Sequence, residues 1–169
     1  MMTDSILLTQ DAYDRLRDEL EQLILVERQQ IAKRIQEARE EGDLKENGGY
    51  HAAKEEQGKI EARINRLEEM LANATVGEAD ASDGVVKQGL LVVCDINGKA
   101  SEFYLGSHEI FEGTKYEEKI EDGDFSVYSP DSPIGQAIEG KKVGEQVTFS
   151  APNGKEIGVV IKQVKDFKF

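Results

Sequence analysis

The sequence predicts an α+β protein in which an N-terminal antiparallel two-helix coiled coil is followed by a small β-sheet domain with one short helix. Two long stretches carry apolar residues at helical spacing, and a short glycine-bearing segment separates them. From residue 85 onward the pattern changes to short strands and Asn-Gly turns. We therefore expect a coiled-coil finger at 1–76, a linker at 77–84 and a C-terminal domain at 85–169.

Composition and charge limit the classes of function. The 169 residues include 34 Asp and Glu against 21 Lys and Arg, a formal net charge of -13. Such a surface repels nucleic acid, so a protein of this kind that acts near RNA must be delivered by a protein partner or use a small basic patch. The N-terminus does not resemble a signal peptide and no stretch is long and apolar enough to span a bilayer, which predicts a cytoplasmic protein with no membrane partner.

The first helix is predicted to begin at Thr9. This residue is a candidate N-cap, and Asp11 places a negative charge in the first turn, where it suits the helix dipole. An apolar seam then runs along the helix, with a step of seven from Ile24 to Ile31, and is interrupted near Glu27 and Arg28. Its members are Leu16, Leu20, Leu23, Ile31, Ile35 and Ala38. Gly42 is placed to end the helix in the left-handed conformation.

The second helix has a more regular seam, in which steps of four and three alternate. Its members are Ala53, Gln57, Ile60, Ile64, Leu67, Leu71 and Ala74. Each of the two seams spans about 33 Å at the rise of an α-helix. Because equal seams joined by a short connector require antiparallel pairing, we expect the connector to lie at one exposed end of the finger.

The C-terminal part is predicted to form a compact α+β domain. Asn-Gly pairs at 97–98 and 153–154 predict two hairpin turns. Ser132 and Pro133 predict an N-cap followed by proline at the first helical position, which opens a short helix that Gly140 ends. The predicted strands are 90–96, 100–105, 125–128, 146–150 and 157–164.

The connector between the two helices holds the candidate functional residues, Asp43 and Glu46. Their D-x-x-E spacing matches a capping box, in which Asp43 would cap the second helix and Glu46 would reach back. Gly48 and Gly49 follow directly, and since each glycine destabilises a helix by up to about 1 kcal/mol relative to Ala, the segment does not favour a firm helix start. Two exposed carboxylates also suit a weakly held Mg²⁺ that completes its coordination on another molecule.

The residues around this connector resemble the tip of the GreA/GreB transcript cleavage factors of bacterial RNA polymerase. The matching residues are Glu41-Gly-Asp-Leu-Lys-Glu-Asn47 and Tyr50-His-Ala-Ala-Lys-Glu-Glu-Gln57. Ser132-Pro-Ile-Gly135 and Gly140-Lys-Lys-Val-Gly144 resemble a segment of the C-terminal domain in that family. The resemblance covers essentially the whole chain, and the charge pattern is closer to GreA-type than to GreB-type members.

The resemblance implies a fold, a partner and a chemistry. The C-terminal domain would be FKBP-like and would dock at the rim of the polymerase secondary channel through Ser132, Pro133 and Ile134, while the coiled coil passes down the channel. Asp43 and Glu46 would help to hold the second Mg²⁺ of the polymerase and to orient the water that cuts backtracked RNA near its 3′ end. The protein would then not be an enzyme by itself, and Mg²⁺ would not be stably bound to the free chain.

Further residues take roles only through the same resemblance. Arg39 and Lys54 correspond to basic residues that contact the extruded RNA, and Asn47 and Tyr50 to further contacts of the tip. Gly48 and Gly49 replace an Ala-Glu pair that is frequent in GreA-type sequences, which removes one charge. We expect a monomer whose partners are bacterial RNA polymerase and the 3′ end of the nascent RNA.

Two other functions stay open on the sequence. A channel-binding regulator of the same architecture would inhibit the polymerase without stimulating cleavage, but such regulators are expected to have altered or extra tip acids, whereas Asp43 and Glu46 are intact. Proline isomerase or chaperone activity of the C-terminal domain would need an aromatic-lined pocket in a chain without Trp. A zinc site at His51 is not supported, because no second His or Cys lies near it in the sequence.

Overall fold

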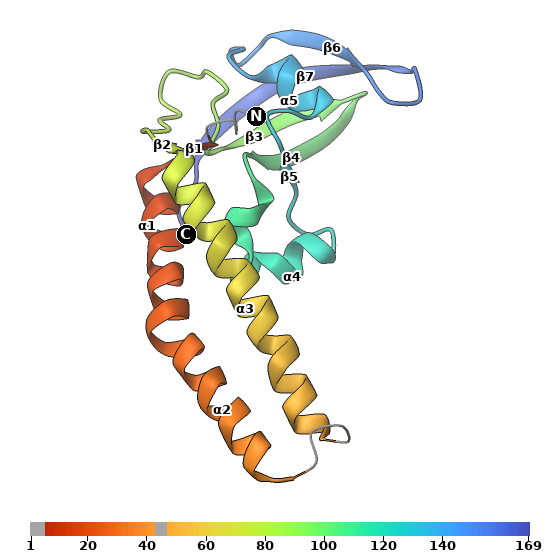
Figure 1. Ribbon diagram of the computed structural model, residues 1–169. Coiled ribbons are helices and arrows are strands. Elements are labelled where there is room, and N and C mark those ends of the chain that lie inside the picture. The colour runs from red at the N-terminus through yellow and green to blue at the C-terminus, as the bar shows by residue number, and fades with distance from the viewer. Residues whose placement is uncertain (1–5, 43–46) are drawn as a thin grey trace. The chain divides into compact units, whose positions relative to one another are not determined.

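The structure is a computed structural model that describes residues 6–42 and 47–169. The chain forms two compact units (Figure 1). The first comprises Tyr13–Ala74, and the second comprises Ile6–Ala12 together with Thr75–Phe169. The first is helical and the second is built on a β-sheet, so the predicted α+β class is confirmed. In the described part of the chain, no helix has the length and apolar character that a membrane span requires.

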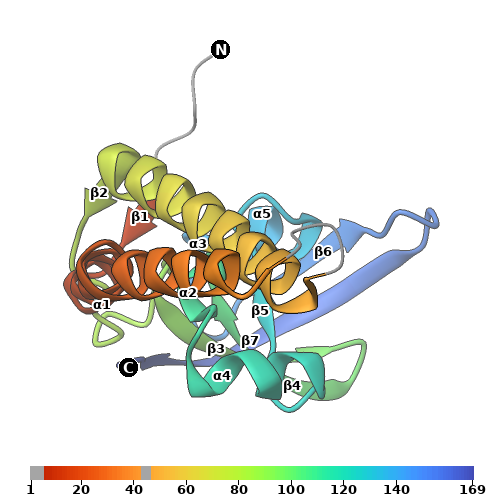
Figure 2. The ribbon, with the colours of Figure 1, turned by 60° about the horizontal axis from the view of Figure 1, so that its bottom comes forward.

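The first unit is a helical hairpin. One arm contains α1 (Gln10–Gln22), which enters this unit at Tyr13, the π-helical turn η1 (Leu23–Glu27) and α2 (Arg28–Glu40). The other arm is the single long helix α3 (Gly48–Asn73). Figure 2 shows α2 and α3 side by side from a second direction, which agrees with their pairing in Figure 1.

The predicted seams lie along the buried stripe of the hairpin, with one shift in each arm. Four of their predicted members besides Leu71 are only partly buried: Leu20, Gln57, Ile60 and Ala74. In the first arm Leu16, Leu23, Ile31, Ile35 and Ala38 are buried. The prediction that Ile24 precedes Ile31 in the seam by a step of seven is wrong, because Leu23 is buried and Ile24 only partly so. The step from Leu23 to Ile31 is eight, and η1 accommodates the extra residue, because a π-helical turn holds more residues than an α-helical turn. The sequence interruption near Glu27 is therefore this turn. In the second arm Met70 is buried, whereas the predicted Leu71 is only partly buried.

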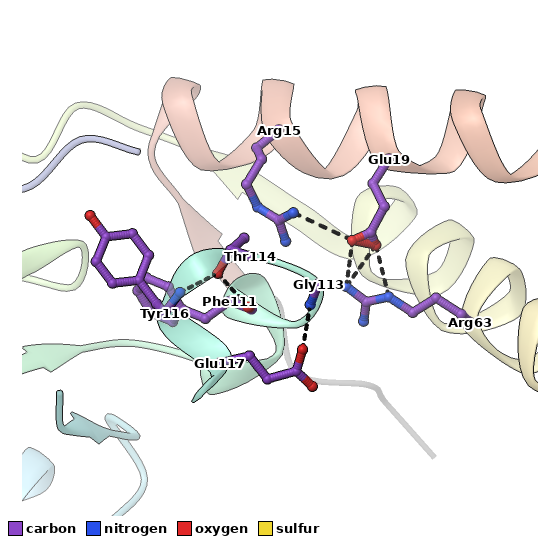
Figure 3. A network of polar contacts seen from close by, with 8 residues as sticks. All are labelled: Arg15, Glu19, Arg63, Phe111, Gly113, Thr114, Tyr116 and Glu117. Carbon is purple, nitrogen blue, oxygen red and sulfur yellow. Dashed lines mark hydrogen bonds and ion pairs between the residues drawn. The ribbon is translucent and has the colours of Figure 1, made fainter. Parts of the chain in front are cut away.

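Ion pairs between the arms accompany the apolar stripe. The Arg63 guanidinium binds the Glu19 carboxylate through Nε at 2.8 Å and Nη2 at 3.0 Å, and Arg15 approaches the same carboxylate at 3.4 Å (Figure 3). Toward the other end of the hairpin, Arg28 binds Glu61 and Arg34 binds Glu56, in that order along the arms. Because each pair joins one residue of each arm, the pairs fix the register of the antiparallel helices.

The second unit contains a five-stranded sheet with the order β5-β4-β3-β7-β6. Its neighbours are antiparallel except for β4 and β5, which are parallel. Both predicted Asn-Gly turns are present, and Asn97 and Gly98 have φ of 50° and 83°, as a two-residue turn between antiparallel strands requires. The strands are β3 (Leu90–Ile96), β4 (Lys99–Leu105), β5 (Val127–Tyr128), β6 (Gln146–Ser150) and β7 (Glu156–Asp166).

Short elements complete this unit. β1 (Ile6–Leu8) pairs with β2 (Ala74–Val76), and Gly77 N–H donates to Leu8 O at 3.0 Å. The predicted short helix is α5 (Pro133–Ile138), which contributes Ile134 and Ile138 to the core of the sheet. A second short helix, α4 (Lys115–Glu121), was not predicted, and it follows the 3₁₀ turn η2 (His108–Phe111).

The start of α4 has a capping pattern that the sequence analysis missed. The Thr114 hydroxyl accepts the Tyr116 N–H at 3.2 Å and donates to Phe111 O, while the Glu117 carboxylate accepts the Gly113 N–H at 2.9 Å (Figure 3). Thr114 and Glu117 are thus spaced as in a capping box. The T-x-x-E pattern was visible in the sequence, and it identifies a helix start that apolar periodicity alone does not show.

Aromatic side chains fill a second region of the same unit. The Phe111 ring is buried and lies with its centroid 4.9 Å from that of Tyr104, 5.2 Å from that of Phe125 and 5.3 Å from that of Phe169. Tyr116 and Phe167 join the same group. Burial, with a smaller contribution from the Asp11 charge, raises the pKa of the Tyr104 hydroxyl well above its usual value. These rings pack on one another and form core.

Candidate functional site

The residues that flank the connector between α2 and α3 define the candidate site. Asp43 and Glu46 themselves lie outside the described residues, so their predicted roles stay predictions. The structure does describe both ends of the segment that carries them. We call Ala38, Arg39, Asn47 and Tyr50 the tip neck, because contacts among these four residues join the end of α2 to the start of α3.

The prediction that Gly42 ends the first arm of the hairpin is confirmed. The helix ends at Glu40, and the N–H of the C-cap residue Glu41 donates to Ala38 O at 3.2 Å. Gly42 follows with φ of +132°, a backbone conformation that is costly for residues with a side chain. The last turn of the helix therefore closes tightly and the chain leaves it at Gly42.

The start of α3 differs from the capping box considered above. The helix begins at Gly48 and its N-cap is Asn47, whose Oδ1 accepts the Tyr50 N–H at 3.0 Å. Asp43 as N-cap of this helix is therefore wrong. Asn47 is the N-cap because its side chain has a second partner that stabilises this position: Nδ2 donates to Ala38 O at 2.6 Å, across the hairpin. Sequence reasoning named Asn47 as a tip contact but missed this cross-helix bond.

Tyr50 is partly structural. Its ring packs against the cluster of Ile31, Ile35 and Ala53, and it is only partly exposed. The Arg39 guanidinium lies 5.7 Å from the centroid of the ring, within the range of a cation–π contact. Since the contact holds Arg39 at the neck, Tyr50 both staples the two helices and places a positive charge beside the connector.

Lys54 is the second predicted basic contact. It is exposed in the second turn of α3, where its Nζ donates to Gln57 Oε1 at 3.0 Å. Arg39 is exposed as well, so both cations are accessible to a ligand of negative charge. Nothing in the structure identifies that ligand as RNA, and this role stays a prediction.

The predicted docking residues belong to the start of α5. The Ser132 hydroxyl accepts the Gly135 N–H at 3.1 Å and donates to Ser129 O, and Pro133 stands in the first turn. Ile134 is buried in the core of the second unit with 5% exposure, whereas Pro133 is exposed. The motif thus has a folding role. Docking at these residues stays a prediction, and only Pro133 presents much of its side chain at the surface.

The described residues offer little chemistry of their own. None of them form a group of three or more His, Cys, Asp or Glu that could hold a metal ion. Cys94 is fully buried, and burial, together with the nearby Asp95 charge, raises the pKa of its thiol to about 11. It is therefore protonated at neutral pH and unsuited to act as a nucleophile.

The fold and the site together define a class of protein. Its members combine a helical hairpin, which has two acidic residues in its connector sequence, with a small β-sheet unit. Two family models match the chain. The model described as transcription elongation factor, N-terminal, matches residues 6–76, and the model described as transcription elongation factor, GreA/GreB, C-term, matches residues 114–166.

Individual relatives extend over nearly the full chain. It is 46% identical to transcription elongation factor GreA of Streptomyces avermitilis over 95% of this chain and 93% of the relative, and 46% identical to GreA of Mycobacteroides abscessus over 98% and 99%. Among solved structures, GreA factor homolog 1 of Thermus thermophilus matches with 28% identity and a TM-score of 0.43 over 95% of this chain and 98% of that chain. The chain belongs to the GreA/GreB family of transcription elongation factors.

Proposed function

We propose that this elongation factor binds bacterial RNA polymerase through the secondary channel and stimulates Mg²⁺-dependent cleavage of the 3′ end of backtracked RNA. The observation that supports the proposal is the place of the acidic pair in the chain. Helix α2 ends at Glu40 and helix α3 begins at Gly48. In the sequence, Asp43 and Glu46 therefore belong to the short connector between the two helices of the hairpin. Residues there can be inserted into another molecule.

The donor set fits a shared magnesium ion. Carboxylate oxygens are the ligands that Mg²⁺ prefers, but two carboxylates leave most of its coordination positions to water or to a partner. Asp43 and Glu46 would therefore bind the ion only together with ligands of the polymerase. In a two-metal site, the ion activates the attacking water and stabilises the leaving oxygen. The contribution of this chain is to deliver the two carboxylates and hold them in place.

Arg39 and Lys54, which lie on either side of the connector in the sequence, have a separate role in this proposal. RNA repels a chain with a net charge of -13, so local cations are needed where the two molecules meet. Arg39 and Lys54 are exposed on the last turn of α2 and the second turn of α3. They would contact phosphates of the extruded RNA, while the C-terminal unit would dock the monomer on the polymerase in the bacterial cytoplasm.

The proposal is tested on a stalled, backtracked elongation complex with Mg²⁺ and added protein. The expected result is release of short 3′ RNA fragments, which is lost with Asp43→Ala and with Glu46→Ala. Asp18→Ala and Glu69→Ala serve as matched controls, because each removes one exposed carboxylate elsewhere on the hairpin and should leave cleavage unchanged.

Two other results would contradict the proposal. Slower elongation without fragments would identify an inhibitor that occupies the channel, and fragments that persist in both tip variants would remove Asp43 and Glu46 from the chemistry. Isomerase activity is not favoured by the second unit, where the buried rings of Tyr104 and Phe111 contact each other and further aromatic side chains.

A further inference from the structure

The Asn47 side chain joins the two helices of the hairpin directly. Its Oδ1 accepts the Tyr50 N–H at 3.0 Å within the first turn of α3, and its Nδ2 donates to Ala38 O at 2.6 Å in the last turn of α2. The first bond caps α3. The second gives Ala38 O, which also accepts the Glu41 N–H at 3.2 Å, a further donor from the other helix. One amide group therefore closes both helix ends at the base of the connector.

Helix capping alone does not require asparagine at this position. Ser, Thr and Asp cap helices as well as Asn does. A carboxylate has no proton to donate at neutral pH. A hydroxyl can accept and donate, as those of Thr114 and Ser132 do, but it is shorter than the Asn amide and does not extend from the N-cap to a carbonyl on the other helix. The hydrogen bond to Ala38 O is therefore the interaction that requires asparagine at position 47.

A second contact crosses the hairpin at the same level. The Arg39 guanidinium lies over the Tyr50 ring, which packs against Ile35 and Ala53. Arg39 follows Ala38 in the sequence, and Tyr50 is the residue whose N–H binds Asn47. The polar and aromatic contacts of the tip neck therefore hold the same two backbone segments, one on each helix.

We propose that Asn47 is a positioning residue for the acidic connector. By tying the last turn of α2 to the first turn of α3, it fixes the two ends between which the chain carries Asp43 and Glu46. Its effect on RNA cleavage rests on the proposed function, whereas its effect on the connector does not. A small misplacement of metal ligands lowers a reaction rate strongly, so loss of the bond should affect the rate of cleavage more than binding.

The matched comparison is Asn47→Ser against Asn47→Ala, with Asn73→Ser as control. Asn47→Ser keeps a capping hydroxyl but cannot reach Ala38 O, and Asn47→Ala loses both bonds. Asn73 Nδ2 donates to Glu69 O within α3, so Asn73→Ser removes an asparagine bond to a helix carbonyl at the other end of the helix. All variants are assayed with full-length protein on backtracked elongation complexes.

At saturating protein, Asn47→Ser should lower the cleavage rate about tenfold or more, because the two ends of the connector are no longer tied together. The protein concentration that gives half of the maximal rate should stay within about twofold, and the melting temperature should stay close to that of the wild type, because the cap is kept. Asn47→Ala should lower both rate and melting temperature, and Asn73→Ser should cleave like the wild type.

Amide hydrogen exchange of the free proteins separates this proposal from the proposed function. Asn47→Ser should speed exchange at Glu41, whose N–H donates to Ala38 O, and at His51, whose N–H donates to Asn47 O, without changing the middle of α3. If the wild type releases no fragments, the proposed function is wrong, and exchange alone decides whether Asn47 fixes the connector. The positioning role is overturned if Asn47→Ser matches the wild type in rate and exchange, or if rate, affinity and melting temperature fall together as they would for a purely structural residue.

Discussion

At the scale of single residues, burial decides what the ion pairs of the hairpin contribute. Arg63 and Glu19 are 11% and 20% exposed in their side chains, whereas Arg34 and Glu56 are 53% and 50% exposed. Both pairs join the same two arms. Exposed pairs are screened by water and contribute little, but removal of one partner from a buried pair leaves a charge without compensation.

Arg63→Ala is expected to lower the free energy of unfolding of the first unit by about 2 kcal/mol, between the values for exposed and buried pairs, because Arg15 stays 3.4 Å from Glu19 and compensates part of its charge. Arg34→Ala should lower it by less than about 0.5 kcal/mol. The measurement is urea denaturation followed by helical circular dichroism. Equal losses in the two variants would show that burial is not what separates these pairs.

Gly135 is the position of the Ser-Pro-Ile-Gly motif at which there is no space for a side chain. A Cβ at this position would lie 2.2 Å from Ser129 O, which is a backbone atom and cannot move alone. Gly135→Ala should therefore destabilise the second unit by about 3 kcal/mol, at the upper end of the cost of overpacking.

Gly158→Ala is the control for Gly135→Ala, because a Cβ there would meet only Asn97 Oδ1, at 3.8 Å. The control should change the stability by less than about 1 kcal/mol. Thermal unfolding followed in the near ultraviolet, where the aromatic cluster absorbs, measures both variants. A Gly135→Ala protein as stable as the control would show that the backbone at Ser129 and Pro130 moves to accommodate the added methyl group.

At the scale of elements, the π-helical turn η1 explains the one irregular step in the first seam. Deletion of Leu25, which is 62% exposed, removes the residue that the turn accommodates and leaves a step of seven between Leu23 and Ile31. We expect the hairpin to tolerate this deletion with a change of less than about 1 kcal/mol, because the buried seam keeps its face.

Deletion of Lys33 is the matched control, since it removes one exposed residue from a regular α-helix. It should cost more than about 3 kcal/mol, because Ile35 and Ala38 then leave their buried positions. Urea denaturation of the two deletion variants gives the comparison. If both deletions lower the free energy of unfolding equally, η1 does not accommodate the extra residue of the seam.

Local patterns predicted most of these elements, and long-range contacts decided the others. Gly42, Ser132 and the Asn-Gly turns were predicted correctly because each acts within a few residues of itself. The start of α3 was not, since Asp43 and Asn47 both fit a cap and the bond that selects Asn47 comes from Ala38 on the other helix. The π-helical turn was missed for a related reason: the apolar run 23–26 fits two seams, and only packing against α3 selects one.

At the scale of the whole molecule, two features matter: the negative net charge and the division of the chain into two units with separate cores. The net charge of -13 does not favour binding to nucleic acid. Among the described residues, Arg39 in the tip neck and Lys54 in the second turn of α3 are exposed cations. Each unit has a buried core of its own, one of seam residues between helices and one between the sheet and α5. We infer that the hairpin and the sheet unit fold on separate sets of contacts.

Differential scanning calorimetry is therefore expected to show two transitions. Arg63→Ala should lower only the transition of the first unit, and Gly135→Ala only that of the second. The shifts should exceed about 5 °C, since 1 kcal/mol corresponds to about 4–8 °C in units of this size. Helical circular dichroism assigns the first transition, and the near-ultraviolet signal of the ring cluster around Phe111 assigns the second. A single transition that both substitutions lower equally would mean that the cores are one cooperative system, because separate cores cannot report on each other's mutations.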